Sequence, residues 1–317
     1  MKLSVAMCTY NGDRYIEPML RSVAAQTLPV DELVVCDDSS TDSTVDHISQ
    51  LATQLGLNLR LYHSQRLGLV CNSQRAIDLC TGDIIFIADQ DDAWHADKTT
   101  KVVAWLQSHP EVDVLFTNAT LIDGIGAPLP GTLFDHYFSP QKRAMFDSGR
   151  AFSALSSNYA TAPTMAIRSR FAKANPFAKY ADAGISNDYI IALLAAAQDR
   201  LGYIAEPLID YRIHASQMLG LSGKWGGYLD PVSTEDMLAT LPPVADTATR
   251  LEQWMNALRF VQWRHRTKHR PTALVYIPLY LGRYRRYYGA SATQVAWTDL
   301  CQCANHSWQR LKNKIAR

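Results

Sequence analysis

The sequence contains no uninterrupted apolar run near the roughly 20 residues that a helix needs to cross a bilayer. Residues 1–5 lead straight into a strand-like pattern, without the charged start and apolar core of a signal peptide. The six cysteines stand singly in apolar contexts or as a Cys-x-Cys pair, a spacing that fits neither a zinc knuckle nor a redox pair. We therefore expect a cytoplasmic protein with reduced thiols, neither secreted nor integral to a membrane.

Two common phosphate-binding patterns are also missing from the turns after the first two predicted strands. Neither turn has the G-x-G-x-x-G of dinucleotide-binding folds or the G-x-x-x-x-G-K-[ST] of a P-loop. This counts against a dehydrogenase or a P-loop kinase. A diphosphate ligand of this protein would need another partner to offset its charge.

Short apolar runs alternate with stretches of helical periodicity along the first two thirds of the chain. This alternation predicts an α/β fold with a mostly parallel sheet flanked by helices. The predicted strands are residues 3–7, 33–36, 59–62, 84–88, 114–116 and 164–167. An apolar helix is predicted at 188–197, whereas residues 123–151 are rich in Gly, Pro, Phe and Tyr and are expected to form loops and a substrate wall.

Three carboxylates, those of Asp89, Asp91 and Asp92, follow directly on the predicted strand 84–88. Open α/β sheets bind ligands at the carboxyl ends of their strands. Three close negative charges repel unless a cation or donors lie between them, and Mg²⁺ or Mn²⁺ prefers oxygen ligands. The sequence therefore predicts a metal-bound polyphosphate here, and the alternative is a solvated acidic turn before a helix that starts near Ala96.

Polar side chains also follow the first two strands. The ring of Tyr10 could stack on a nucleobase, and the carboxylate of Asp38 could accept the imide N–H of a uracil or thymine. The Ser, Thr and Asp residues at 39–42 have a simpler interpretation as caps of the next helix.

Taken together, six motifs resemble those of bacterial family 2 glycosyltransferases of the GT-A fold, particularly the rhamnosyltransferase-like members. They are Cys8-Thr9-Tyr10-Asn11-Gly12, Cys36-Asp37-Asp38-Ser39-Ser40-Thr41-Asp42, Gly68-Leu69-Val70-Cys71-Asn72, Ala88-Asp89-Gln90-Asp91-Asp92-Ala93-Trp94, Asn187-Asp188 and Tyr211-Arg212-Ile213-His214. The resemblance implies a GT-A catalytic domain at 1–220, followed by a helical, basic and aromatic C-terminal region at 221–317. It implies inverting transfer of rhamnose or a hexose to a glycan or polyprenyl-linked acceptor in cell-surface polysaccharide synthesis.

The resemblance also implies a role for each site residue. The residues expected to bind a dTDP or UDP sugar are Thr9, Tyr10, Asn11, Asp38, Asn72, Asp91 and Arg212. The residues expected to hold Mg²⁺ or Mn²⁺ are Asp92, Asp91 and His214. Asp188 is expected to take the proton from the acceptor hydroxyl, although it could also cap the helix that follows. Residues 162–165 read Ala-Pro-Thr-Met where relatives often have Gly-Cys-Thr-Met, which leaves the acceptor geometry open.

Residues 259–317 carry twelve basic side chains against one acidic, a net charge of +11 in a chain whose total is +1. Their arginines alternate with aromatic residues, a composition typical of segments that lie on an anionic membrane. The alternative is a helical appendage packed on the catalytic domain or on the second subunit of a homodimer. No nucleic-acid-binding module accompanies the charge, so we expect no nucleic-acid partner.

Two other functions stay open at the sequence level. A Mg²⁺-dependent phosphotransferase would need an aspartate nucleophile at the end of the first strand, where this chain has Thr9, Tyr10 and Asn11. A non-catalytic nucleotide-sugar-binding scaffold would share the binding residues but would not need Asp188.

Overall fold

The computed structural model describes residues 1–151, 155, 158–183, 186–217, 252 and 296–297. The chain divides into two compact units, Met1–Ser222 and Gly223–Arg317. The predicted C-terminal helices lie outside the described residues, so the helical appendage stays a prediction. Among the described residues, no helix is both long and apolar enough to cross a membrane.

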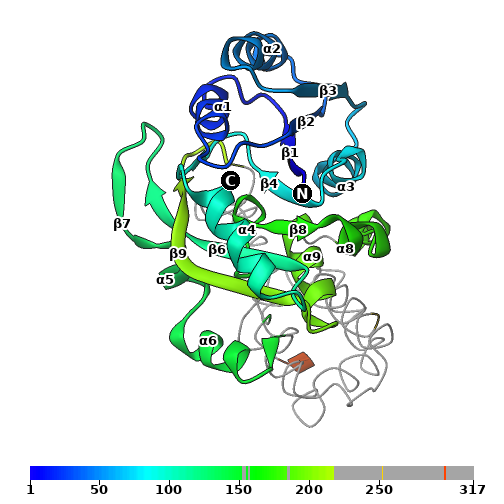
Figure 1. Cartoon of the computed structure of the whole chain (residues 1–317), viewed down its shortest axis with the longest axis vertical. Coiled ribbons are helices and arrows are strands. Elements are labelled where there is room, and N and C mark those ends of the chain that lie inside the picture. The colour runs from blue at the N-terminus through cyan, green and yellow to red at the C-terminus, as the bar shows by residue number, and fades with distance from the viewer. Residues whose placement is uncertain (152–154, 156–157, 184–185, 218–251, 253–295, 298–317) are drawn as a thin grey trace, which may run out of the picture. The chain divides into compact units, whose positions relative to one another are not determined.

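The first unit is built on one nine-stranded sheet with the order β3-β2-β1-β4-β8-β6-β9-β5, and β7 pairs with β6 (Figure 1). The strands are β1 (Leu3–Thr9), β2 (Glu32–Asp37), β3 (Leu59–His63), β4 (Ile84–Ala88), β5 (Ala93–Trp94), β6 (Val114–Ile122), β7 (Pro128–Thr132), β8 (Ala166–Arg168) and β9 (Leu201–Arg212). Strands β1 to β4 are parallel, as expected. The other half is mixed, because β8 runs antiparallel to both β4 and β6 while β9 runs parallel to β6.

Helices flank this sheet, and the predicted α/β fold class is confirmed. They are α1 (Ile16–Ala24), α2 (Thr44–Leu55), α3 (Leu69–Leu79), α4 (Lys98–Ser108), α5 (Leu133–Tyr137), α6 (Pro140–Asp147), α8 (Ser169–Ala174) and α9 (Asn187–Ala196), with 3₁₀ turns η1 (Ala162–Thr164) and η2 (Ala178–Ala183). Helices α1 and α2 pack together, and α3 packs against β1 and β2 on the other side of these strands (Figure 1). Because both faces are covered, every residue of β2 and β4 is buried.

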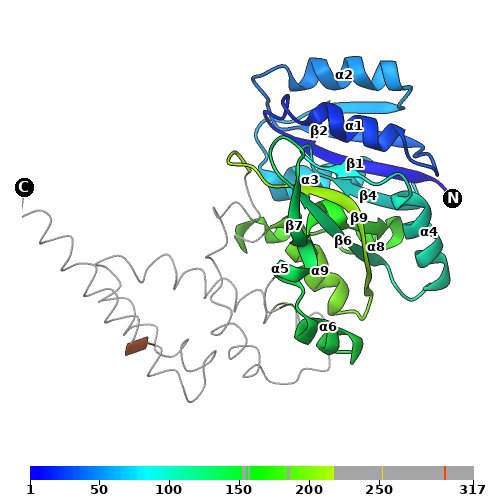
Figure 2. The same cartoon turned by 90° about the vertical axis from the view of Figure 1, so that its left-hand side faces the viewer.

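The predicted loop region at 123–151 instead contains β7, α5 and α6. A capping box starts α5, in which Thr132 and Asp135 exchange side-chain and backbone hydrogen bonds. Strands β6, β7 and β9 lie together below β1 and β4, with α5 and α6 beneath them (Figure 2). The local capping signal shows why a region without clear periodicity still forms helices.

The curl of the sheet determines where the acidic residues lie. Strand β5 is the last strand in the sheet order, yet it follows the central strand β4 after only four residues, 89–92. Such a short connection requires the sheet to bend until its last strand returns to the carboxyl end of β4. The segment 89–92 is therefore held between two strands that are each paired with other parts of the sheet.

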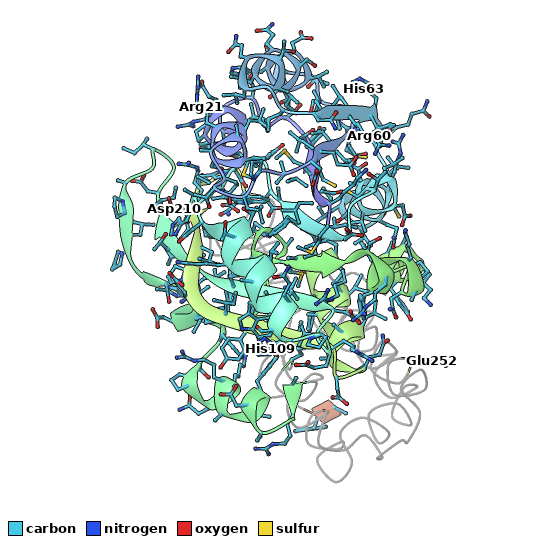
Figure 3. All side chains as sticks on the ribbon, viewed as in Figure 1. Arg21, Arg60, His63, His109, Asp210 and Glu252 are labelled. Atoms are coloured by element: carbon cyan, nitrogen blue, oxygen red, sulfur yellow. The ribbon has the colours of Figure 1, made fainter. Side chains whose placement is uncertain are left out.

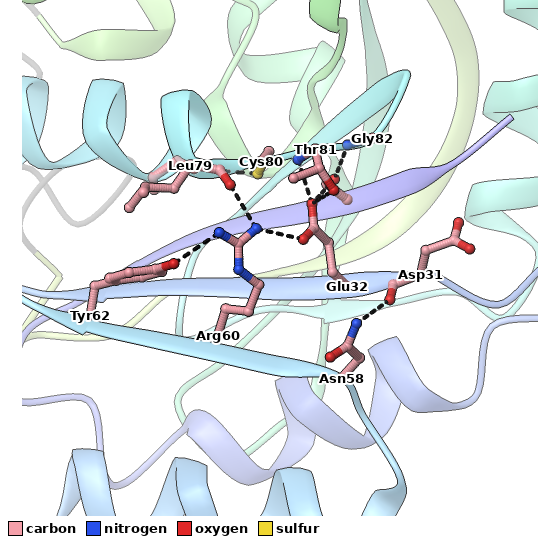
Figure 4. Close-up of polar contacts among 11 residues, drawn as sticks. Asp31, Glu32, Asn58, Arg60, Tyr62, Leu79, Cys80, Thr81 and Gly82 are labelled. Carbon is pink, nitrogen blue, oxygen red and sulfur yellow. Dashed lines mark hydrogen bonds and ion pairs between the residues drawn. The ribbon is translucent and has the colours of Figure 1, made fainter.

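An ion pair between the buried Glu32 and the partly exposed Arg60 holds the opposite ends of the parallel strands. Glu32 accepts hydrogen bonds from Ser4 Oγ (2.6 Å), Arg60 Nη1 (2.8 Å) and the Thr81 N–H (2.5 Å) (Figure 4). Burial alone would raise the pKa of Glu32, but these donors lower it from 4.5 to about 2. The glutamate thus joins β1, β2, β3 and the turn before β4.

This arrangement predicts a stability change in acid. A carboxyl group whose pKa is lowered by folding stabilises the protein above its unfolded pKa, and this stabilisation, roughly 2–3 kcal/mol here, disappears as pH falls toward the folded pKa. We expect the free energy of unfolding to fall less between about pH 5 and pH 2.5 in Glu32→Gln than in the wild type. Urea unfolding at a series of pH values measures this. Glu17→Gln, on an exposed pair with Arg21, is the control, and equal slopes for Glu32→Gln and wild type would contradict the prediction.

Candidate active site

The side chains of Asp89, Asp91 and Asp92, here called the acidic junction, converge between β4 and β5. One oxygen from each carboxylate lies within 4.8 Å of the others. Burial, then Asp91 and Asp188, raise the pKa of Asp89 to about 8, and burial with Asp91 and Asp89 raises that of Asp92 well above its usual value. The fold therefore holds together acidic groups that repel one another.

The two oxygens of Asp92 have different environments. The side chain is only 1% exposed, and Oδ1 accepts a hydrogen bond from the backbone N–H of Arg212 at 2.8 Å. Oδ2 is buried and has no hydrogen-bond partner within the described part of the chain. Buried carboxylate oxygens normally have a partner. An orphaned oxygen among two more carboxylates fits a hard divalent cation, so these residues fit the predicted Mg²⁺ or Mn²⁺.

Residues at the end of β9 and just after it close this side of the junction. The guanidinium of Arg212 donates to the backbone carbonyls of Asp91 (2.7 Å) and Asp123 (3.2 Å). His214 Nε2 lies 2.8 Å from Asp91 Oδ2, and its ring packs on Tyr15 with a centroid separation of 4.4 Å. The structure thus brings both predicted residues to the junction. Arg212, however, is engaged with the protein backbone, which makes it a support of the junction.

A side-chain contact also joins β9 to the residue that follows β5. Asp210, labelled on β9 in Figure 3, lies 3.0 Å from His95 Nε2, just after β5. Together with the β5–β9 ladder, this contact fixes the far end of the segment 89–92.

Gln90 connects the junction to the end of β1. Its Oε1 accepts from the N–H of Tyr10 at 3.0 Å, and its Nε2 donates to the carbonyl of Tyr10 at 3.1 Å. A Cβ on Gly12 would come within 2.2 Å of Gln90 Oε1, so a larger residue would displace the Gln90 side chain from the backbone of Tyr10. Asn11 has a φ of +47°, and its Oδ1 accepts from the N–H of Thr41 at 2.8 Å. The motif after β1 therefore shapes the site mainly through its backbone.

The proposed nucleobase residues lie together after β1 and β2. Asp38 accepts hydrogen bonds from the N–H groups of Leu67 (2.7 Å) and Gly68 (3.0 Å). Each carboxylate oxygen has two lone pairs, so Asp38 retains capacity to accept from a ligand. Arg66 lies 5.2 Å from the centroid of the Tyr10 ring and donates to the Tyr10 hydroxyl at 2.6 Å.

Two residues expected to touch the donor have internal partners instead. Thr9 Oγ1 donates to Asp37 at 2.8 Å. Asn72 donates to the carbonyl of Cys36 at 2.8 Å and accepts from Ser64 Oγ at 2.8 Å. Both side chains are buried. Their placement does not support donor contact, since these bonds account for their polar groups and tie neighbouring elements together.

Asp188 lies at the start of α9 and is held by several donors. Its Oδ2 accepts from the N–H of Ala162 at 3.0 Å, and its Oδ1 accepts from the N–H of Tyr189 at 2.7 Å and from the hydroxyl of Ser186. Burial raises the pKa of this carboxyl, although the hydrogen bonds oppose the shift. The charge of Asp188 also raises the pKa of Asp89, so the two carboxylates interact electrostatically.

Two tyrosines that were assigned no role from the sequence interact with these carboxylates. Burial and then Asp188 raise the pKa of Tyr137 to about 12. Burial and then Asp92 raise the pKa of Tyr211 well above its usual value. Tyr137 ends α5, so the aromatic richness of residues 123–151 was the signal for it.

Comparison with known proteins identifies the family. The family described as Glycosyl transferase family 2 matches residues 4–172, which is more than half of the chain. The chain belongs to glycosyl transferase family 2. All the described strand-end residues after β1, β2 and β4 fall within the matched segment of this family 2 protein, whereas Asp188, Arg212 and His214 lie beyond it.

Curated relatives match only part of this family 2 chain. An uncharacterized glycosyltransferase of Nostoc sp. is 32% identical over 124 residues, covering 39% of this chain and 38% of that protein. The poly(ribitol-phosphate) beta-N-acetylglucosaminyltransferase TarS of Staphylococcus aureus is 30% identical over 130 residues, covering 40% of this chain and 22% of TarS. The chain thus matches less than half the length of either relative.

Solved structures extend the likeness in fold. The crystal structure of S. aureus TarS 1–349 in complex with UDP-GlcNAc has a TM-score of 0.59 at 19% identity, covering 98% of this chain and 92% of that one. Glucosyl-3-phosphoglycerate synthase from Mycobacterium tuberculosis, in complex with Mn²⁺, UDP-glucose and phosphoglyceric acid, has a TM-score of 0.50 at 17% identity, covering 76% and 81%. At these identities the likeness shows the fold.

The raised pKa of Asp89 predicts how stability changes with pH without metal. Burial and the neighbouring carboxylates raise the pKa of Asp89 to about 8, so this carboxyl binds its proton more tightly in the folded protein than in the unfolded chain, where it titrates near pH 4. Stability contributed by Asp89 is therefore lost as pH rises from about 4 to 8. In EDTA, we expect the free energy of unfolding to fall less from about pH 5 to pH 8 in Asp89→Asn than in the wild type.

Urea unfolding across this pH range measures the effect. Asp46→Asn, an exposed position on α2, should reproduce the wild-type slope. An Asp89→Asn slope that matches the wild type would show that Asp89 does not hold this proton.

Proposed function

We propose that this family 2 protein is a metal-dependent, inverting glycosyltransferase that uses a nucleoside-diphosphate sugar. The observation that carries the proposal is the buried, unpartnered Oδ2 of Asp92 within the acidic junction. Such an oxygen is costly to bury unless a ligand compensates it. A cation that also binds a diphosphate meets this requirement, and family membership supplies the reaction class.

The donor would bind along the carboxyl ends of β1, β2 and β4. Asp38 would accept the imide N–H of a uracil or thymine, and the ring of Tyr10 would pack on that base. Asp92 and Asp91, with His214, would hold Mg²⁺ or Mn²⁺. When bound, the ion stabilises negative charge on the departing diphosphate.

Asp188 would act on the acceptor. Its carboxylate takes the proton of the acceptor hydroxyl as that oxygen attacks the anomeric carbon, opposite the nucleoside diphosphate, so the configuration inverts. The hydrogen bonds from Ala162 and Tyr189 orient the group and favour its charged form, which is the form a base needs. Capping of α9 and proton transfer are thus compatible roles for one carboxylate.

The substrate class follows from the same site. A dTDP or UDP donor suits Asp38, and TarS and the mycobacterial synthase were crystallised with UDP-sugars. The sugar would be rhamnose or a hexose, and the acceptor a glycan or polyprenyl-linked glycan of the cell surface. TarS, by its name, transfers N-acetylglucosamine to poly(ribitol-phosphate), so its acceptor is a polymer. The enzyme would act in the cytoplasm, with its basic C-terminal region at the inner membrane face.

The first test is ligand-dependent stabilisation. UDP or dTDP with Mn²⁺ should raise the Tm, since a ligand at about 100 times its Kd stabilises by about 2.7 kcal/mol. EDTA should abolish most of the shift, and Asp92→Asn should reduce it. ATP with Mn²⁺ and NAD are the controls. An equal response to ATP would contradict recognition of a pyrimidine by Asp38.

The second test separates catalysis from binding. Asp188→Asn should lower kcat by about 10²- to 10⁴-fold because general-base assistance is lost. The Mn²⁺-UDP shift in Tm should stay as in the wild type. Transfer is measured as nucleoside diphosphate released in the presence of polyprenyl-linked glycans.

Asp135→Asn is the matched control for this test, because Asp135 caps α5. It should keep the wild-type kcat. Full activity of Asp188→Asn would exclude Asp188 as the base and leave the donor site untouched.

A further inference from the structure

Lys98, the first residue of α4, is fully buried with 0% of its surface exposed. Its Nζ donates to the carbonyl of Pro163 at 2.7 Å and lies 4.1 Å from the centroid of the Trp94 ring. Within the described part of the chain, no carboxylate lies within 4.0 Å of this ammonium group. An ammonium group is costly to bury unless it is compensated, so this placement calls for an explanation.

The carbonyl that Lys98 contacts belongs to the turn that holds Asp188. In η1, the residue before Pro163 is Ala162, whose N–H donates to Asp188 Oδ2 at 3.0 Å. One short turn is thus held on one side by Lys98 and on the other by Asp188. The ring of Pro163 fixes its own φ, which stiffens the turn between these two contacts.

Lys98 also lies on the side of the acidic junction. Lys98 contacts the ring of Trp94, the last residue of β5, and β5 directly follows Asp92. Burial lowers the pKa of Lys98 to about 7, while the charges of Asp92 and Asp89 favour its protonated form. The ammonium group therefore interacts electrostatically with the proposed metal ligands, and it donates a hydrogen bond to η1, the turn on the proposed acceptor side.

We propose that Lys98 is a positioning residue for the transfer reaction. Through the Pro163 carbonyl it fixes η1, and through the Ala162 N–H that turn fixes the carboxylate of Asp188 relative to the acidic junction. The inference rests on the proposed function, because it assigns Lys98 an effect on the base. The inference also explains how Ala162 and Pro163 can replace the Gly-Cys common in relatives, since the contacts use only backbone groups of these residues.

The experiment replaces the ammonium group with an apolar side chain of similar length. Lys98→Met should fold, because replacing a buried charge by an apolar group of similar volume is often neutral or stabilising. We expect kcat to fall by about 10- to 100-fold, since small displacements of a catalytic group have effects of this size. The Mn²⁺-UDP shift in Tm should not fall below that of the wild type, because the donor contacts are unchanged and a positive charge near the cation-binding carboxylates is removed.

Lys101→Met is the matched control. Lys101 lies on the same helix, is half-exposed, and pairs with Asp97 and Glu206. This variant should keep the wild-type kcat. Lys98→Gln is the second test variant, because its shorter, neutral amide should also lower kcat while leaving donor binding intact.

A double-mutant cycle separates positioning from an independent role. If Lys98 acts through Asp188, then adding Lys98→Met to Asp188→Asn should lower kcat by less than about twofold more, because the group being positioned is already gone. A further loss of tenfold or more would overturn the proposal. A merely structural role predicts that the two losses multiply.

The other outcomes are equally decisive. If a folded Lys98 variant keeps the wild-type kcat, the inference is overturned. It is also overturned if the variant loses the Mn²⁺-UDP shift in Tm to the same extent as it loses kcat. If Asp188→Asn loses activity while Lys98→Met does not, only this inference fails. If Asp188→Asn is fully active, the proposed base fails first.

Discussion

The site depends on one constraint, which is that the fold holds three carboxylates together in a four-residue connection. Their repulsion is opposed by fixed groups around them: the backbone N–H of Arg212 on Asp92, the imidazole of His214 on Asp91, and the buried ammonium of Lys98. None of these groups reaches Oδ2 of Asp92. The compensation is therefore incomplete in a way that a divalent cation would complete.

The curled sheet makes this constraint possible. Strand β5 pairs with β9, and β9 runs back along β6, so the chain around residue 212 returns to the junction formed around residue 92. The register of β6 and β9 shifts between Thr117 and Asn118, where Pro207 enters the pairing. A proline lacks the N–H for a regular ladder, so it suits such an irregularity. We therefore attribute both the bend of β9 and the position of Arg212 at its end to the irregular pairing around Pro207.

Local sequence pattern was enough to predict the parallel strands. Strands β1, β2 and β4 are buried on both faces, so they appear as apolar runs, and the predicted bounds differ from the observed ones by two residues or fewer. Strand β9 was missed because Glu206, Pro207 and Asp210 interrupt its pattern, and only pairing with β6 makes it a strand. In such a segment, pairing with a neighbouring strand outweighs the low strand propensity of the individual residues.

In the site, too, local features could be predicted from the sequence, whereas contacts between distant segments could not. The acidic junction is contiguous in the sequence, so its crowding could be foreseen. The contact between Arg212 and Asp92, 120 residues apart, could be expected only through family resemblance. Thr9 and Asn72 match a motif, yet their side chains support neighbouring elements, because a motif records which residue is present and not which way it faces.

The two halves of the site are built differently, and this affects what each can recognise. The proposed donor half consists of backbone turns at the ends of parallel strands, where Gln90 bonds to the backbone of Tyr10 and lies against Gly12. The proposed acceptor half consists of η1, the start of α9 and the end of α5, where Asp188 accepts from the N–H of Ala162 and its charge acts on the partly buried Tyr137. Changes in these short segments can alter the space beside Asp188 without disturbing the sheet. Under the proposed function, the strand ends would set the reaction class, and the turns beside Asp188 would set the acceptor.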